Sequence, residues 1–262
     1  MLKQRVATAL VALAILALVL FVLPQAVARL VIAAIILTGA WEWGGFLFRD
    51  SASRRGIYAA FVALAGAALL YRMPDAALLD VVLKTGLGWW CAALVWLFFY
   101  PTRIPLPVSW VAGALLLVPA WMALDYLYMR APELLLFALL IVWFADIGAY
   151  FVGRGFGRVK LAPQISPGKT WEGVLGALTA VTVLAAAGAW FLTLEVAVLV
   201  PFCLAVTMLS IVGDLTVSMF KRTAGVKDSG TLFPGHGGVL DRIDSVTAAA
   251  PLFAVALPWI GL

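Results

Sequence analysis

The sequence predicts an all-α, polytopic integral membrane protein, and its composition, hydropathy and charge placement each support that fold class. Of the 262 residues, 65% are hydrophobic and only 12% are charged, whereas soluble domains have about 25% charged residues. A larger core cannot absorb the shortfall, because a soluble core still needs a polar shell. The chain must therefore expose apolar surface to lipid, and its net charge of +5 does not indicate a nucleic-acid partner.

About nine segments are apolar and long enough to cross a bilayer, which takes about 20 residues. The breaks between them contain proline, glycine or clustered charge, and we find no strand-like alternation and no internal repeat. The ends of the third and fourth segments are the least well defined. We expect the spans at residues 6–23, 27–48, 57–72, 82–99, 108–128, 133–152, 172–192, 196–220 and 245–261.

The first of these segments allows two interpretations. It follows Lys3 and Arg5, and residues 26–28 (Ala-Val-Ala) are similar to a signal-peptidase site. The apolar run is longer than a usual signal-peptide core, and many further spans follow it. We therefore expect a retained first helix.

The basic residues predict the orientation, because cytoplasmic loops are enriched in Lys and Arg. With the N-terminus inside, 14 of the 18 basic residues lie on the cytoplasmic side, and the other 4 are Arg29, Arg72, Lys84 and Arg130. This split predicts an N-in, C-out protein of the cell's inner membrane. Two long polar connections, 153–171 and 221–244, then lie in the cytosol, where loops of this kind often have a function.

Three acids lie inside predicted spans, where an ionisable group costs about 2.5–3.5 kcal/mol and so indicates function. Glu42, Asp146 and Asp214 each stand before the cytoplasmic end of a span by about 9 Å of helix, so we expect them at one depth. A structural alternative pairs each acid with a nearby cation or backbone group, and it remains open for Glu42. Asp125 lies near the opposite face, where we expect a wet, structural role.

Asp214 also begins a polar stripe on its helix. Ser218, Lys221 and Arg222 follow at spacings that place them on the same helical face. An acid, a hydroxyl and two cations suit a site that binds a metal and a phosphate. A lipid-facing surface would not tolerate this stripe, so we expect the face to point inward.

The segment 218–244 reads SMFKRTAGVKDSGTLFPGHGGVLDRID. It resembles, without a departure, the C-terminal signature of the phosphatidate cytidylyltransferase (CDP-diacylglycerol synthase) family. Residues 146–150 (DIGAY), the glycine run 153–157 and residues 165–173 (ISPGKTWEG) are similar to the same family. The resemblance covers roughly the C-terminal half, so we divide the single membrane domain, 1–262, into variable N-terminal helices at 1–130 and a catalytic half at 131–262.

The resemblance implies that the chain binds CTP and phosphatidic acid in the bilayer and forms CDP-diacylglycerol and pyrophosphate, with Mg²⁺ required and a second cation plausible. The lipid phosphate is already ionised, so the obstacle is repulsion between two anions. Catalysis should consist of charge neutralisation and in-line positioning. Hard carboxylate oxygens suit Mg²⁺, and Lys, Arg and glycine N–H groups suit phosphate.

The resemblance also assigns residues to roles. The metal ligands are expected to be Asp214 and Asp241, followed by Asp146. The residues expected in catalysis are Lys221, Arg222, Lys227, Asp228, His236, Arg242 and Asp244. The residues expected to bind substrate are Arg154, Lys169, Ser218, Gly237 and Gly238.

Each assignment has a structural alternative. Asp241 and Asp244 could simply favour the N-terminal end of the last helix, and Lys221 and Arg222 could be positive-inside anchors. His236 lacks a second His or Cys nearby and would orient a neighbour or contact phosphate. We interpret residues 166–167 (Ser-Pro) as a helix cap, the glycine run 153–157 as unrelated to dinucleotide binding, and the two cysteines as packing residues.

Three other functional classes remain as alternatives. A CTP-dependent lipid-alcohol kinase would share the nucleotide and the membrane setting, but the full signature argues against it. A secondary transporter could also contain intramembrane acids, but the sequence has no inverted repeat. A CDP-alcohol phosphotransferase would need a DGxxAR…GxxxDxxxD pattern, which is absent. A homodimer is compatible with the sequence, although no motif demonstrates one.

Overall fold

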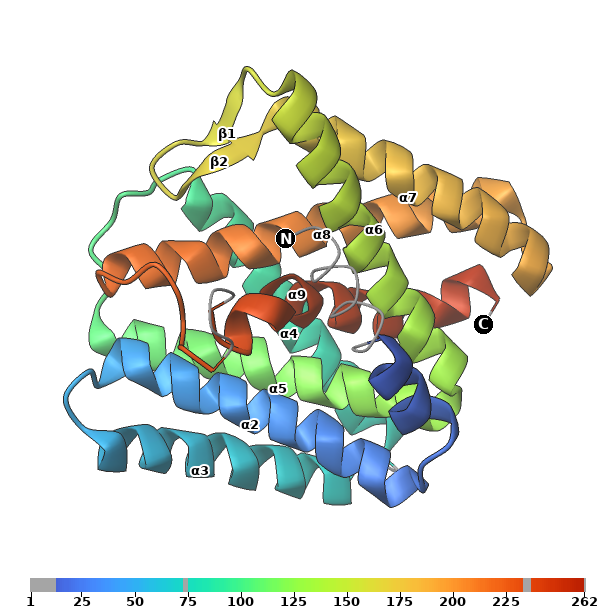
Figure 1. The fold of residues 1–262 in the computed structure, drawn as a ribbon. Coiled ribbons are helices and arrows are strands. Elements are labelled where there is room, and N and C mark those ends of the chain that lie inside the picture. Colours follow the sequence, from blue (N-terminus) through green and yellow to red (C-terminus); the bar gives the residue numbers. More distant parts are fainter. Residues whose placement is uncertain (1–12, 73–74, 233–236, 262) are drawn as a thin grey trace.

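The computed structural model describes residues 13–72, 75–232 and 237–261 of the chain. They form a bundle of long helices with one short hairpin (Figure 1). Within these residues, 8 helices are long and apolar enough to cross a membrane, so the all-α, polytopic fold class is confirmed. Residues 13–21 of the first expected span are helical, whereas Lys3 and Arg5 lie outside the described residues.

The helices follow the expected spans closely. Their bounds are α2 (Gln25–Leu47), α3 (Ala52–Tyr71), α4 (Ala76–Leu97), α5 (Leu106–Arg130), α6 (Pro132–Phe156), α7 (Trp171–Leu192), α8 (Val196–Thr223) and α9 (Leu240–Ala256), followed by the 3₁₀ turn η1 (Leu257–Ile260).

The third and fourth spans begin earlier than expected because polar residues cap them. The Ser51 hydroxyl accepts the Arg54 N–H at 3.3 Å, and the Asp75 carboxylate accepts the N–H groups of Ala77 and Leu78 at 3.0 and 3.2 Å. Such caps satisfy the N–H groups that a helix start leaves without partners. Hydropathy does not detect these polar first turns.

Charged residues that the sequence placed in loops also lie on helices. Arg154 is in the last turn of α6, Lys221 and Arg222 are in the last turn of α8, and Asp241 is in the first turn of α9. Cations near a helix C-terminus and acids near an N-terminus interact favourably with the helix dipole. The two long polar connections are therefore shorter than predicted.

The connection between α6 and α7 contains an antiparallel hairpin that the sequence analysis did not predict. Strand β1 (Lys160–Ala162) pairs with strand β2 (Ser166–Thr170). The interpretation of residues 166–167 as a helix cap is therefore wrong, because both residues belong to β2. The cap of α7 is Thr170, whose hydroxyl accepts the Gly173 N–H at 3.1 Å.

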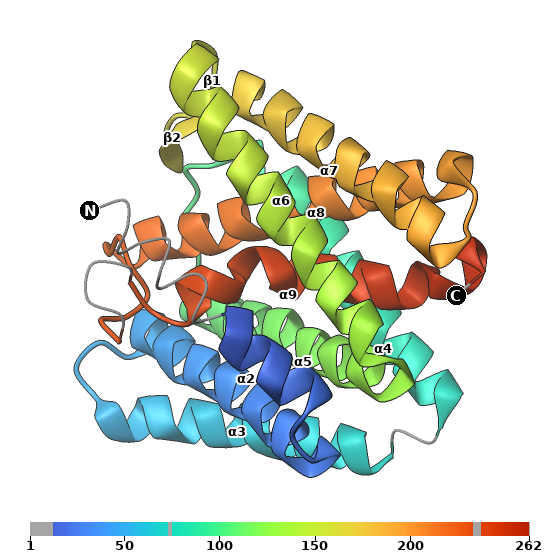
Figure 2. The ribbon, with the colours of Figure 1, turned by 45° about the vertical axis from the view of Figure 1, so that its right-hand side comes forward.

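Consecutive connections alternate between the two ends of the bundle. The α2–α3, α4–α5 and α8–α9 connections and the hairpin gather on the left of both views, and the α3–α4, α5–α6 and α7–α8 connections lie on the right (Figures 1 and 2). The left-hand connections are those that the sequence assigned to the cytosol. Which end faces the cytosol remains a prediction.

Helix α9 lies at the centre of the bundle, between α5 and α8 (Figure 2). Its membrane-spanning window is 72% buried, compared with 17% for α3 at the edge. The signature residues at the start of α9 are thus held by neighbours on several sides.

A buried ion pair joins α2 to α5. The guanidinium of Arg29 donates to both carboxylate oxygens of Asp125, at 2.7 and 2.9 Å. Asp125 is 0% exposed, so the expected structural role is supported, whereas the expected wet environment is wrong. Both cysteines are free; Cys203 is buried, as expected of a packing residue, whereas Cys91 is exposed.

Candidate active site

Helices α6 and α7 approach each other through glycines. A Cβ atom on Gly148 would lie 2.4 Å from the carbonyl oxygen of Gly176, and one on Gly176 would lie 2.5 Å from the oxygen of Gly148. Any side chain at either position would force the helices apart. This close packing sets the position of the hairpin that connects the two helices, and the hairpin ends in Lys169 and Thr170.

Lys169 reaches from β2 to the polar stripe of α8. Its ammonium lies 2.6 Å from Oδ2 of Asp214, while the hydroxyl of Ser218 donates to Oδ1 of the same carboxylate at 3.2 Å. Both charged side chains remain about one quarter exposed, at 27% and 26%. The predicted inward stripe is therefore present, and Lys169, which pairs with it, lines a neighbouring cavity.

A second ion pair connects α8 to α9. The ammonium of Lys221 donates to Oδ1 of Asp241 at 2.8 Å, and both side chains are only 9% exposed. Oδ2 of Asp241 accepts the N–H groups of Ser229 and Gly238 at 2.8 and 2.9 Å. Asp241 thus holds the signature loop against α8, in addition to lying at a helix N-terminus.

Two further carboxylates lie near these pairs. Asp146 on α6 and Asp244 on α9 each interact electrostatically with Asp214 and with Lys169. Asp244 is buried, and its Oδ1 accepts the Ser245 N–H at 2.8 Å. Like charges this close repel one another in a low dielectric. The cluster is therefore suited to a cationic ligand.

Glu42 does not join this cluster. Its carboxylate accepts hydrogen bonds from Ser229 Oγ and from the N–H groups of Val239 and Leu240, at 2.7, 2.9 and 2.8 Å. The structural alternative that was left open for Glu42 is therefore supported. Asp146 and Asp214 do come together as expected.

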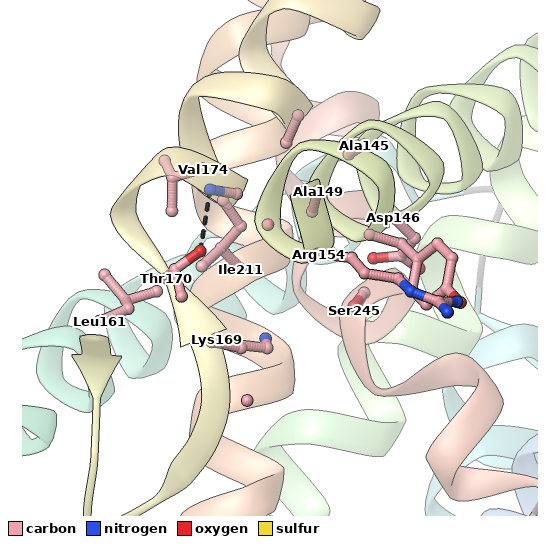
Figure 3. A pocket seen from close by; sticks show the side chains of 15 residues that line it. Ala145, Asp146, Ala149, Arg154, Leu161, Lys169, Thr170, Val174, Ile211 and Ser245 are labelled. Atoms are coloured by element: carbon pink, nitrogen blue, oxygen red, sulfur yellow. Dashed lines mark hydrogen bonds between the residues drawn. The ribbon is translucent and has the colours of Figure 1, made fainter. Parts of the chain in front are cut away.

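A cavity of about 370 Å³ opens beside these charges. Figure 3 shows Asp146 on α6, Lys169 on β2 and Ser245 on α9 around it. The wall also includes apolar side chains from the hairpin, α7 and α8. The full lining is Ala145, Asp146, Ala149, Tyr150, Gly153, Arg154, Leu161, Gly168, Lys169, Thr170, Gly173, Val174, Ala177, Ile211 and Ser245. A charged group and an apolar group of one ligand could therefore bind side by side.

Arg154 lies at the edge of this cavity. It is exposed, donates to the Tyr150 hydroxyl at 2.6 Å and lies over the Tyr150 ring at 5.8 Å. Arg242 is also exposed and interacts electrostatically with Asp146. Both cations are therefore near the acidic cluster and in contact with solvent.

Other predicted residues have different surroundings. Arg222 donates to the carbonyl oxygens of Ile165 and Val226 at 3.1 and 3.5 Å, which ties the hairpin turn to the end of α8. Lys227 and Asp228 are exposed on the loop after α8. Gly237 has a positive φ of 79°, a conformation that favours glycine. His236 lies outside the described residues.

Comparisons with known proteins show the family of the chain. The sequence profile of the cytidylyltransferase family matches residues 3–259. The chain belongs to this family. A phosphatidate cytidylyltransferase of Pseudomonas aeruginosa is 46% identical over 99% of the chain and 97% of its own length. One from Haemophilus influenzae is 39% identical over 97% and 98%, and one from Brucella suis is 40% identical over 64% and 57%.

Membership of this family makes the chain a nucleotidyltransferase that uses CTP. The bacterial relatives and the apolar helices together indicate a multi-pass membrane protein. The resemblance seen in the C-terminal half thus extends over nearly the whole sequence, including the N-terminal helices. The division into a variable part, 1–130, and a catalytic part, 131–262, remains a prediction.

The donor set around the cavity consists of hard oxygen atoms. Among the residues that the structure describes, no three His, Cys, Asp or Glu side chains gather closely enough to hold a metal by themselves. Mg²⁺ usually takes only one or two carboxylates and completes its shell with water and substrate phosphates. The acids Asp146, Asp214 and Asp244 therefore fit a shared Mg²⁺ better than a protein-only metal centre.

Several contributing residues were not predicted. Glu172 accepts the Val159 N–H at 3.2 Å through its carboxylate and so secures the base of the hairpin. The apolar walls of the cavity come from Leu161, Val174 and Ile211, which in the sequence look like any other lipid-facing or core residue. Glu172 lies in the first turn of α7 and within the segment 165–173 that resembles the family, and these two features could have indicated its role.

Proposed function

We propose that this protein is a phosphatidate cytidylyltransferase that transfers the CMP moiety of CTP to phosphatidic acid and releases pyrophosphate. The strongest support is the position of the signature residues relative to the other charged residues of the site. Lys221 and Asp244 of the signature interact with Asp214, and Lys221 also binds Asp241. Asp214 in turn pairs with Lys169, which lines a cavity with polar and apolar walls. A lipid phosphate and a nucleotide phosphate need such a combination in order to meet.

In the proposed reaction, an oxygen of the phosphatidic acid phosphate attacks the α-phosphorus of CTP. A new P–O–P linkage forms, and the bond between the α-phosphorus and the β-phosphate oxygen breaks, so that pyrophosphate leaves with the electron pair. The attacking phosphate is already ionised and needs no general base. The protein therefore has to neutralise charge and hold the reacting groups in line.

The cations of the site supply that neutralisation. Lys169 and Arg154 face the cavity from the hairpin and from α6, so they are placed to bind a triphosphate arriving from water. Lys221 is buried with Asp241 and can stabilise charge near the attacked phosphorus. Arg222, Lys227, Arg242 and the glycines at 237–238 remain proposed phosphate contacts, with Asp228, Ser218 and His236 in supporting roles.

Mg²⁺ is part of this proposal, and the proposal also has room for a second cation. When bound, Mg²⁺ would screen the charge on the phosphate oxygens. Asp214 and Asp146 are the first proposed ligands, Asp244 lies near Asp214 from α9, and Asp241 is a further proposed ligand. Together, Asp146, Asp214 and Asp244 exceed the charge of Lys169, the one cation in direct contact with the Asp214 carboxylate among the described residues.

The proposed location follows from the substrates. Phosphatidic acid presents its phosphate at headgroup level and CTP is cytosolic, so we place the left-hand end of the bundle in Figure 1 on the cytoplasmic side of the inner membrane. Labelling of single cysteines introduced at Lys160 and at Arg130 in intact cells tests this orientation. A reagent that cannot cross the membrane should label only the second position. Cross-linking of purified protein tests the predicted homodimer.

Radiolabelled CTP tests the reaction. Purified protein with phosphatidic acid and Mg²⁺ should transfer the label from the α-phosphate of CTP into lipid. It should also release one unlabelled pyrophosphate for each labelled lipid formed. A lipid-alcohol kinase would instead transfer the γ-label to a lipid alcohol. Substrate counterflow in vesicles without CTP consumption would favour a transporter. Either result would refute the proposed activity.

A further inference from the structure

Among the described residues, the hydrogen-bond donors to Glu42 of α2 all lie in the segment that contains the family signature. Its carboxylate is 7% exposed and accepts hydrogen bonds from Ser229 Oγ, Val239 N–H and Leu240 N–H, at 2.7, 2.9 and 2.8 Å. These donors lie almost the whole chain away in sequence. A charged group buried in this way is expensive unless several donors surround it.

The signature segment is shaped around this carboxylate. A Cβ atom on Gly238 would lie 2.3 Å from Oε2 of Glu42, and one on Gly230 would lie 2.5 Å from Oε1. Neither position could bear a side chain while the carboxylate remains where it is. The two glycines therefore allow backbone atoms on both sides of Glu42 to come close to it.

Glu42 is connected to the active-site ion pair through two short paths. Ser229 donates its hydroxyl to Glu42 and its N–H to Asp241, and Asp241 in turn binds Lys221. Leu240, whose N–H also binds Glu42, is the first residue of α9, immediately before Asp241. A shift of the Glu42 carboxylate would thus move the acids at the start of α9.

The hydrogen bonds also require an ionised acceptor. The N–H groups at a helix start have no partners within the helix and carry partial positive charge. Among the described residues, no Lys or Arg forms an ion pair with Glu42, so backbone dipoles and the Ser229 hydroxyl offset its charge. An amide at this position would turn its NH₂ group toward at least one of these donors.

We propose that Glu42 is a positioning residue for the cytidylyl transfer, because it holds Ser229, Val239 and the start of α9 and thereby sets where Asp241, Asp244 and Lys221 stand around the reacting phosphates. This inference rests on the proposed function. It also gives the N-terminal helices a part in the active site, which the sequence had assigned to the C-terminal half alone.

The test compares Glu42→Gln with Glu133→Gln, the same chemical change at an exposed acid in the first turn of α6. Hydrogen exchange measured by mass spectrometry should become faster in the peptide that covers residues 229–240 of Glu42→Gln, and nowhere in Glu133→Gln. The kcat of Glu42→Gln should fall on the order of 10²-fold, as expected for a misplaced catalytic group. The KM for CTP should change by less than about threefold.

Glu42→Asp should restore part of the kcat, because it keeps the charge on a shorter side chain. A merely structural residue would instead lower the amount of folded protein and leave the kcat of that fraction unchanged. Unaltered exchange at 229–240, or an unaltered kcat in folded Glu42→Gln, would overturn the proposal.

If Glu42→Gln does not insert into the membrane, a milder variant tests the same proposal. Ser229→Ala removes one of the three hydrogen bonds and leaves the charge in place. It should speed exchange in the same peptide and lower kcat by about 3-fold to 10-fold, the effect of about one hydrogen bond. Wild-type values for both would refute the proposal. The exchange result stands even if wild-type protein proves to lack cytidylyl transfer, so the two failures are distinguishable.

Discussion

Two ion pairs of this protein each bind an acid that lies inside a span, but they differ in their surroundings. Arg29 and Asp125 form a closed pair in which the guanidinium occupies both oxygens of a fully buried carboxylate, although the Arg29 side chain itself is 36% exposed. Lys169 and Asp214 are each about one quarter exposed, and two more carboxylates interact with Asp214. The first pair is balanced in charge, whereas the second has an excess of acid beside a cavity.

The comparison teaches that an ionisable residue in a membrane span does not by itself indicate function. A closed pair joins two helices and leaves no group free to bind a ligand. An acidic cluster that borders a cavity retains unbalanced charge, which a substrate or metal can neutralise. The same reasoning separates Glu42, which backbone donors satisfy, from Asp146, which faces the cavity.

Removing the charge of Asp214 should have the largest effect on activity. Asp214→Asn should insert normally but lose on the order of 10³-fold in kcat/KM, because both Lys169 and the proposed Mg²⁺ lose their shared ligand. Asp241→Asn should behave similarly, since it leaves Lys221 without its carboxylate. The assay is lipid labelling from α-labelled CTP. Near-normal turnover in either folded variant would remove that residue from the proposed site.

Chelation of divalent cations should abolish the same activity. Excess EDTA is expected to stop product formation, and added Mg²⁺ to restore it, because hard oxygen donors surround the cavity. Ca²⁺ should restore less, since it prefers more ligands at longer distances. Full activity in EDTA after extensive dialysis would contradict a metal requirement.

Lys221→Ala should reduce activity by on the order of 10²-fold, and Arg130→Ala by less than about twofold. Lys221 is buried beside Asp241, whereas Arg130 is exposed at the end of α5, on the opposite side of the bundle. The two variants are compared at equal amounts of folded protein. Equal losses would contradict the assignment of the active site to the end that contains the signature.

Asp125→Asn should have the smallest effect on chemistry and a clear effect on stability. It leaves the Arg29 guanidinium with only a neutral partner, at a cost of about 1–3 kcal/mol. The melting temperature in detergent should fall, while the kcat of the remaining folded protein should stay within about twofold of wild type. A large loss of kcat without a change in melting temperature would show that the Arg29–Asp125 pair, like the Lys169–Asp214 pair, contributes to catalysis.

Much of the fold could be predicted from the sequence, because membrane insertion depends on local hydropathy. The spans from α2 to η1 agree with the predicted segments to within a few residues, and the differences occur at polar caps such as Ser51 and Asp75. The hairpin was missed because its strands are short and contain Gly and Pro rather than an alternating pattern. Pairing across the turn and the contacts of Glu172 and Arg222 stabilise it, and none of these leaves a local pattern.

The candidate site was predictable only where the residue types are unusual. Carboxylates and lysines in an apolar chain attract attention, so Asp146, Asp214 and Lys221 could be selected from sequence alone, and the family signature added Asp241 and Asp244. Their partners could not be predicted in this way. Lys169 binds Asp214 and Glu42 binds the signature loop across long sequence separations, through contacts that leave no local pattern.

The sequence by itself determined that this chain spans a membrane, where its helices run and which chemistry its last spans resemble. These properties depend on composition and short-range pattern. The tertiary structure alone decided which acids share a cavity and which are closed off in pairs. The surroundings of each acid depend on how closely α6 and α7 pack at Gly148 and Gly176 and on where α9 lies in the bundle. The reason is that burial and charge balance are set by the residues that are neighbours in space, which can lie far apart in sequence.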